Sequence, residues 1–168
     1  MLAIILIALG LLLRIAPHAP NFTPVAAIAL FAGAYLNKKY AINVPVVLMV
    51  TSDLIIGLHN VTLFTWGGFV LIAALGMLLK KQKSPAKVVS MSLLSALLFY
   101  AVSNFGVWAM GWYPPTFKGL VTCYVMALPF LRNFTAATLY YTVAFFAVYE
   151  LSARLVKETK YSRVLLAK

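Results

Sequence analysis

Asp53 is the residue whose type and position in this sequence most directly suggest chemistry. It lies in an apolar stretch, residues 41–58, and we expect it to be the only acidic side chain inside such a stretch. A charged group at the middle of a bilayer costs roughly 2.5 to 3.5 kcal/mol on insertion scales, so an ionisable residue there is a candidate functional residue. Asp53 lies five residues before the end of the stretch, which places it about 8 Å below that end.

Other polar residues are expected to lie close to Asp53. Asn104 has a similar depth in the apolar stretch 88–110, six residues from its end. We predict that these two residues and neighbouring loop residues bind a small molecule, because a few donors and acceptors among Tyr, Trp and Met side chains are typical of a ligand site. The remaining predicted substrate-binding residues are Arg14, His18, Asn21, Trp108 and Asn133.

A structural role for the same residues stays open. Asp53 could instead form an ion pair with Arg14 or Arg132, since buried charges in membranes usually pair with one another. The two interpretations are compatible, because a substrate could bridge an existing pair. His18 could equally be an ordinary loop residue at the membrane interface.

The sequence shows no apparatus for covalent chemistry. No spacing matches a phosphate-binding loop, a dinucleotide fingerprint, a zinc-protease helix or a nucleophile elbow. Cys123 is the only cysteine, which excludes an intrachain disulfide and a multi-cysteine metal site. We therefore expect no enzyme activity, no catalytic residue, no cofactor and no metal site.

Composition places the chain among membrane proteins. Hydrophobic residues make up 64% of the 168 residues, charged residues make up 10%, and the mean hydropathy is +0.96. A soluble domain could not bury this much apolar surface. The net charge of +11 does not indicate nucleic-acid binding, because the basic residues lie at the ends of apolar segments rather than on a continuous basic face.

The apolar segments predict one integral membrane domain over residues 1–168. We expect an all-α polytopic bundle of six transmembrane helices, since a span needs roughly 17 to 25 apolar residues. Proline-rich and lysine-rich loops separate the segments. The predicted spans are residues 2–15, 24–36, 41–58, 61–79, 88–110 and 134–155.

Residues 120–131 are apolar but short. If they spanned the membrane, the basic carboxyl-terminal tail would lie opposite the other lysine-rich loops, which the positive-inside rule opposes. We therefore predict a re-entrant or interfacial helix here, before the last span.

Basic residues are distributed unequally between the two sides of the predicted bundle. With six spans, eleven of the fourteen Lys and Arg residues lie on one side, leaving Arg14, Lys118 and Arg132 on the other. This asymmetry predicts a multi-pass protein of the bacterial inner (cytoplasmic) membrane with both termini in the cytoplasm. The candidate ligand-binding residues then face away from the cytoplasm.

Ala29 and Gly33 form a pair of small residues four positions apart. Such a pair permits close approach of two helices, either within the bundle or to a helix of a partner protein. We predict that it is a helix-packing surface.

Four segments carry a resemblance to a known family. They are Arg14-x-x-Pro17-His18-x-Pro20-Asn21-Phe22-Thr23-Pro24-Val25-Ala26-Ala27, Ser52-Asp53-Leu54, Asn104-Phe105-x-x-Trp108 and Ala127-Leu128-Pro129-Phe130-x-Arg132-Asn133. Nearly the whole chain resembles an uncharacterised family of small bacterial membrane proteins, which is similar to the substrate-binding S components of energy-coupling-factor (ECF) vitamin transporters. That second likeness lies in size, six spans, cytoplasmic termini and an outer loop after the first helix.

The resemblance implies a bundle that captures a vitamin or other micronutrient, with the first loop as a gate. Its partners would be a transmembrane coupling subunit and two ATPases. S components carry Ala-x-x-x-Ala on the first helix, whereas Ala3 and Ala8 are five apart here. The resemblance as a whole predicts a substrate-capture subunit of an uptake transporter. The alternative is a structural or accessory subunit of a larger membrane complex, with no ligand of its own.

Overall fold

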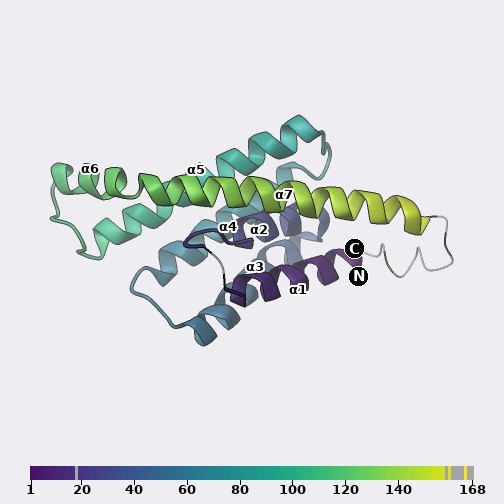
Figure 1. Ribbon diagram of the computed structural model, residues 1–168, viewed down its shortest axis with the longest axis horizontal. Coiled ribbons are helices and arrows are strands. Elements are labelled where there is room, and N and C mark those ends of the chain that lie inside the picture. Colours follow the sequence, from purple (N-terminus) through teal and green to yellow (C-terminus); the bar gives the residue numbers. More distant parts are fainter. Residues whose placement is uncertain (18, 158, 160–164, 166–168) are drawn as a thin grey trace.

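The structure is a computed structural model that describes residues 1–17, 19–157, 159 and 165. Helices are the only regular elements in these ranges, so the expected all-α class is confirmed. Figure 1 shows α6 beside the start of α7 at one end of the molecule and Met1 toward the other end. The seven helices are α1 (Leu2–Ile15), α2 (Val25–Tyr35), α3 (Lys38–Ile56), α4 (Thr62–Leu78), α5 (Pro85–Ala109), α6 (Phe117–Met126) and α7 (Leu128–Lys157).

Helix α2 forms the centre of the bundle. Every residue from Val25 to Tyr35 is buried, and α1, α3, α4, α5 and α7 all pack against this helix. Six of its eleven residues are Ala or Gly, which lets neighbouring backbones approach closely on all sides. A helix that is apolar around its whole circumference belongs either in such a core or in a membrane.

Glycines allow α2 and α4 to cross in direct contact. A Cβ on Gly33 would lie 2.2 Å from the carbonyl oxygen of Ala73, and a Cβ on Gly76 would lie 2.2 Å from that of Leu30. Both distances are far below van der Waals contact, so only glycine fits at either position. The packing surface predicted from Gly33 therefore faces α4 of the same chain.

The predicted boundaries of α5, α6 and α7 need correction. The helix predicted over 120–131 is instead α6, which ends at Met126, and the last helix begins at Leu128 rather than at 134. Pro129 explains the interruption, because proline has no backbone N–H to continue the hydrogen bonding of α6 and is accommodated without loss in the first turn of a new helix. Helix α5 begins three residues earlier than predicted, at Pro85, because Ser84 caps it by accepting a hydrogen bond from the backbone N–H of Lys87 at 3.4 Å.

Three of the described helices, α3, α5 and α7, are long and apolar enough to cross a membrane. Helices α1, α2, α4 and α6 are apolar but shorter, at 10 to 17 residues. Large apolar side chains also point outward, an arrangement suited to lipid rather than water. Examples are Ile4, Leu54, Leu63, Leu97 and Leu155, all more than half exposed. The chain is therefore a membrane protein, whereas the number of spans stays a prediction.

Candidate functional site

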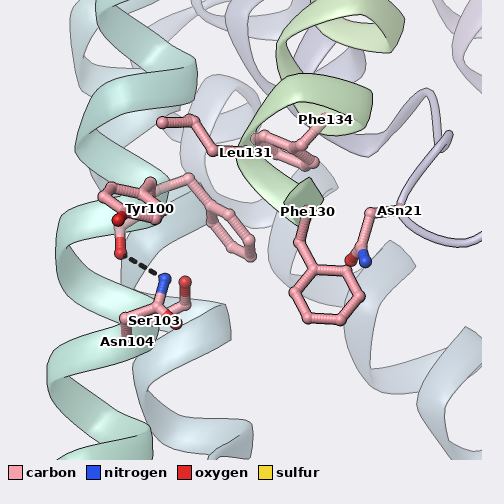
Figure 2. A pocket seen from close by; sticks show the side chains of 8 residues that line it. Asn21, Tyr100, Ser103, Asn104, Phe130, Leu131 and Phe134 are labelled. Atoms are coloured by element: carbon pink, nitrogen blue, oxygen red, sulfur yellow. Dashed lines mark hydrogen bonds between the residues drawn. The ribbon is translucent and has the colours of Figure 1, made fainter. Parts of the chain in front are cut away.

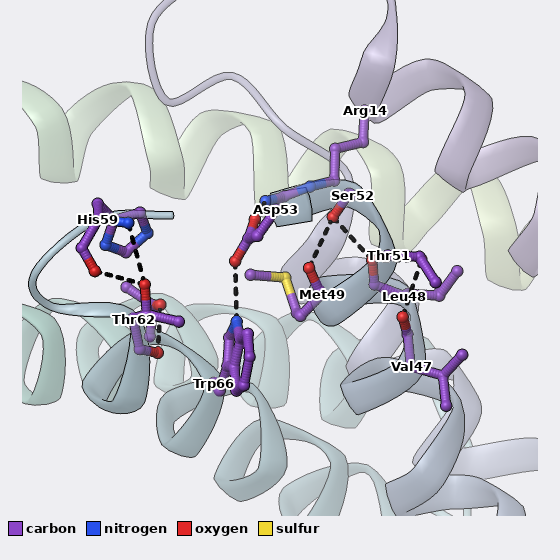
Figure 3. A network of polar contacts seen from close by, with 11 residues as sticks. Arg14, Val47, Leu48, Met49, Thr51, Ser52, Asp53, His59, Thr62 and Trp66 are labelled. Atoms are coloured by element: carbon purple, nitrogen blue, oxygen red, sulfur yellow. Dashed lines mark hydrogen bonds and ion pairs between the residues drawn. The ribbon is translucent and has the colours of Figure 1, made fainter. Parts of the chain in front are cut away.

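Asp53 is the acceptor in a closed ionic cluster between three helices. Its Oδ1 lies 2.6 Å from a guanidinium nitrogen of Arg14, at the end of α1. Its Oδ2 accepts a hydrogen bond of 2.8 Å from the indole nitrogen of Trp66, on α4. The side chains of Asp53 and Arg14 are only 3% and 14% exposed. Figure 3 shows Arg14 and Trp66 reaching the carboxylate from opposite sides.

The turn after α3 positions Trp66 for this contact. The hydroxyl of Thr62, at the start of α4, donates a hydrogen bond to the carbonyl of His59 at 2.5 Å. It accepts one from the backbone N–H of His59 at 3.2 Å. These bonds satisfy the backbone N–H and carbonyl of His59, in the turn just before α4. Trp66 follows Thr62 by four residues and so lies on the same face of the helix, toward Asp53. Both carboxylate oxygens are thus engaged by the protein, so the geometry makes Asp53 a link between helices.

A separate cavity of about 160 Å³ lies between α5, the first turns of α7 and the loop that precedes α2. Figure 2 shows Tyr100, Ser103 and Asn104 on α5, with Phe130 and Leu131 of α7 opposite them. Asn21 closes the side next to the loop. The cavity reaches the surface, since Asn21 is exposed and Phe130 is 53% exposed. The described residues that line it are Asn21, Phe99, Tyr100, Ser103, Asn104, Phe130, Leu131 and Phe134.

The cavity has uncharged polar groups on an aromatic background. Asn104 donates one amide N–H to the carbonyl of Tyr100 at 2.8 Å, which fixes the amide; its Oδ1 and second N–H remain as an acceptor and a donor. Among the described residues, the hydroxyl of Ser103 and the side chain of Asn21 form no hydrogen bond with the protein. The rings of Phe99 and Phe134 stack with centroids 4.6 Å apart. These features can hold a flat, neutral molecule with hydrogen-bonding groups on its edge.

Helix α7 holds the loop that carries Asn21. Asn133 donates to the carbonyl of Pro20 at 3.4 Å, and the ring of Phe22 packs against Tyr141 with centroids 5.8 Å apart. Asn21 itself has a φ of 59°, a left-handed conformation that asparagine tolerates better than most residues. The loop is thus positioned by its own backbone and by α7.

The predicted site residues therefore separate into distinct places. Asn21 and Asn104 line the cavity, Asn133 holds the loop beside it, and Arg14 pairs with Asp53 outside the cavity lining.

The remaining predicted site residues lie elsewhere. Trp108 donates to the carbonyl of Pro114 at 3.0 Å and lines a different hollow, between α5 and α6. Ala29 and Gly33 are buried in α2. His18 lies outside the described residues.

The expectation that Asp53 is the only acidic residue within a span was wrong, because Glu150 lies inside the predicted span 134–155. The hydroxyl of Tyr35 donates a hydrogen bond to the carboxylate of Glu150 at 2.5 Å. Lys83 lies over the ring of Tyr35, 5.0 Å from its centroid. This second polar group joins α2, α7 and the loop before α5.

Sequence reasoning also missed most of the cavity lining. Ser103 stands next to Asn104 in an apolar segment, and this pair of polar residues was the available signal. Phe130 and Phe134 are four residues apart, a spacing that puts both rings on one helix face. That face became recognisable only once α7 was known to begin at Leu128.

Comparison with protein families matches residues 1–161 to a "Family of unknown function (DUF6580)". The chain belongs to this family. Neither the curated proteins nor the solved structures include a match. Membership of a family without assigned function is thus confirmed, whereas the likeness to ECF transporter S components stays a prediction.

Proposed function

We propose that this member of the family captures a neutral small molecule in the cavity beside Asn104. The observation that carries the proposal is the lining itself, which combines aromatic rings, two amides and two hydroxyls and has no charged side chain among the described residues. A charged ligand would lose its hydration there without gaining a counterion. A neutral ligand with edge donors and acceptors would pair with Asn21, Ser103 and Asn104.

The volume sets the size of the ligand. A cavity of about 150 Å³ accepts a benzene ring, and this one measures about 160 Å³. The ligand is therefore a single planar ring with one or two polar substituents. Its faces would contact Phe99 and Phe130, and its edge would meet the amide of Asn104.

The loop before α2 supplies the gate in this proposal. Asn21 is both part of the lining and part of the loop, so movement of the loop would open or close the cavity. The contacts between this loop and α7, from Asn133 to Pro20 and from Phe22 to Tyr141, are few and partly exposed, which suits an element that must open and reclose. Ligand bound to Asn21 would favour the closed loop.

The proposed topology has six spans and places both termini in the cytoplasm. Helices α1, α2 and α4 are the three shorter spans beside α3, α5 and α7, with α6 as an interfacial helix. Length alone does not separate α6, with ten residues, from α2, with eleven. We assign α6 to the interface because a seventh span would put the basic carboxyl-terminal tail opposite the other lysine-rich loops. The asymmetry of the Lys and Arg residues supports this orientation for the inner membrane of a bacterium, with the cavity facing outward.

The biological role that fits these features is a substrate-capture subunit of a micronutrient or vitamin uptake transporter. Release of the ligand to the cytoplasm would require a partner that supplies energy, such as a coupling subunit with ATPases. Support comes from the small size, the helical bundle and the loop over an outward cavity.

A screen of ring compounds tests the proposal. Purified full-length protein is incubated with matched neutral, acidic and basic single-ring compounds, and thermal unfolding is followed. We expect neutral amides to raise the melting temperature and Asn104→Leu to abolish the shift. Asn43→Leu, an exposed change on α3, is the matched control and should retain it. Equal shifts from charged compounds, or an unchanged shift in Asn104→Leu, would contradict the proposal.

A second candidate function is an accessory subunit of a larger membrane complex. The specific observation in its favour is the closed cluster of Arg14, Asp53 and Trp66, which joins helices and offers no carboxylate oxygen to a ligand. Purification in a mild detergent distinguishes the two. Stoichiometric association with a large complex, without stabilisation by any ring compound, would favour this candidate.

A further inference from the structure

A groove of about 540 Å³ lies between the beginning of α5 and the carboxyl-terminal half of α7. The two helices run antiparallel here, so the groove is at the opposite end of α5 from the Asn104 cavity. Val88, Val143 and Phe146 form apolar walls, whereas Lys83 and Arg154 stand at the edge. The remaining lining residues are Tyr35, Pro85, Val89, Ala147 and Glu150.

The charge around this groove is strongly positive. Among the described lining residues Glu150 is the single acidic one, and it already accepts a hydrogen bond from the hydroxyl of Tyr35. The basic residues of the groove and of the adjoining loop and helix ends are Lys80, Lys81, Lys83, Lys87, Arg154 and Lys157. An anion is therefore attracted to this end of the molecule.

The walls of the groove continue into an outward-facing apolar surface. Val89 is 37% exposed and Val143 is 51% exposed, and Leu93 and Leu97 extend the same side of α5 with large exposed side chains. A ligand held at the basic edge could thus place a hydrocarbon chain along α5. Inorganic phosphate would use the edge and leave the walls uncovered.

From these contacts we propose that the groove binds one anionic phospholipid. The phosphate lies between Lys83 and Arg154, and an acyl chain lies along Val89 and Val143. Basic pockets between helices on the cytoplasmic side of membrane proteins suit such headgroups. The proposal is independent of the ligand at Asn104. In the orientation proposed above, the lipid comes from the cytoplasmic leaflet.

Native mass spectrometry of the full chain, titrated with lipid in detergent, tests this site. The probes are phosphatidylglycerol, phosphatidylcholine and inorganic phosphate. We expect phosphatidylglycerol to bind and the other two to bind at least tenfold more weakly. Binding of phosphatidylcholine with the same Kd, or of inorganic phosphate as tightly as phosphatidylglycerol, would overturn the lipid assignment.

Matched variants locate the site. Arg154→Gln should weaken phosphatidylglycerol binding about fivefold, the effect of one basic residue near a membrane surface. Arg132→Gln is the control, because Arg132 is also an exposed arginine of α7 but lies near its other end. Glu150→Gln should strengthen binding, since it removes the acidic charge and keeps an acceptor for Tyr35. Equal losses in the two arginine variants, or weaker binding in Glu150→Gln, would overturn the proposal.

Discussion

Replacing Asp53 with asparagine should destabilise the bundle, because it removes the charge that neutralises a largely buried arginine. Asparagine has the same shape and can still accept the indole hydrogen bond of Trp66. The guanidinium of Arg14, which is 14% exposed, would lose its counterion. The variant therefore isolates the contribution of charge from that of packing.

The expected magnitude follows from the burial of the pair. Removing one partner of a buried ion pair costs about 3 to 5 kcal/mol. The slight exposure of Arg14 and the retained acceptor place Asp53→Asn at the lower end, about 3 kcal/mol. For a chain of this length that corresponds to a decrease in melting temperature of roughly 6 to 12 °C.

Thermal unfolding in detergent, followed by circular dichroism, measures this decrease. Glu150→Gln is the matched control, since it makes the same acid-to-amide change at an exposed side chain and should shift stability by less than about 1 kcal/mol. The double variant Arg14→Gln/Asp53→Asn should lose less than the sum of the single variants. If Asp53→Asn melted like the unmodified protein, the cluster would not be a structural link, and the carboxylate would be available for another role.

Three further changes test the packing and the loop. Gly33→Ala should destabilise the fold by about 1 to 3 kcal/mol by forcing α2 and α4 apart, whereas Gly67→Ala, which meets no atom within 4 Å, should be neutral or slightly stabilising in the same unfolding assay. Trp66→Phe should cost about 1.5 to 3 kcal/mol by removing a hydrogen bond to a charged acceptor, and a loss below 0.5 kcal/mol would contradict its role. Phe22→Ala should speed hydrogen exchange at residues 19–24 without changing exchange in α2, and unchanged exchange in the loop would show that its contact with α7 does not hold it.

The sequence predicted which segments are helical, since composition and proline positions carry that information, and it gave Arg14 as one of two possible partners of Asp53. It did not predict that Asp53 and Asn104 would lie in two different places, Asp53 in the ionic cluster and Asn104 in the cavity. Their spacing from the span ends gives a depth along the helix axis but no direction around it. That direction depends on how α3 and α5 pack against α2, and it turns Asp53 toward Trp66 and Asn104 toward Phe130.

The beginning of the last helix was the other point that sequence periodicity could not locate. Residues 120–131 read as one apolar segment, but Pro129 starts a new helix inside it. This shift adds Phe130 to the helix that carries Phe134, opposite Ser103, and so completes the aromatic wall of the cavity. Pro129, near the end of the predicted segment, was thus the decisive local signal for the start of a new helix.

Labelling of a cysteine in the cavity tests the central claim most directly. Ser103→Cys is introduced together with Cys123→Ala in cells or sealed vesicles of known orientation, and a membrane-impermeant thiol reagent is added to either side. We expect Ser103→Cys to react only from outside and to be protected by a neutral ring ligand. Gln82→Cys, in the lysine-rich loop, should react only from the cytoplasmic side. Reaction at position 103 only from the cytoplasmic side, or no reaction from either side, would contradict an outward-facing capture cavity.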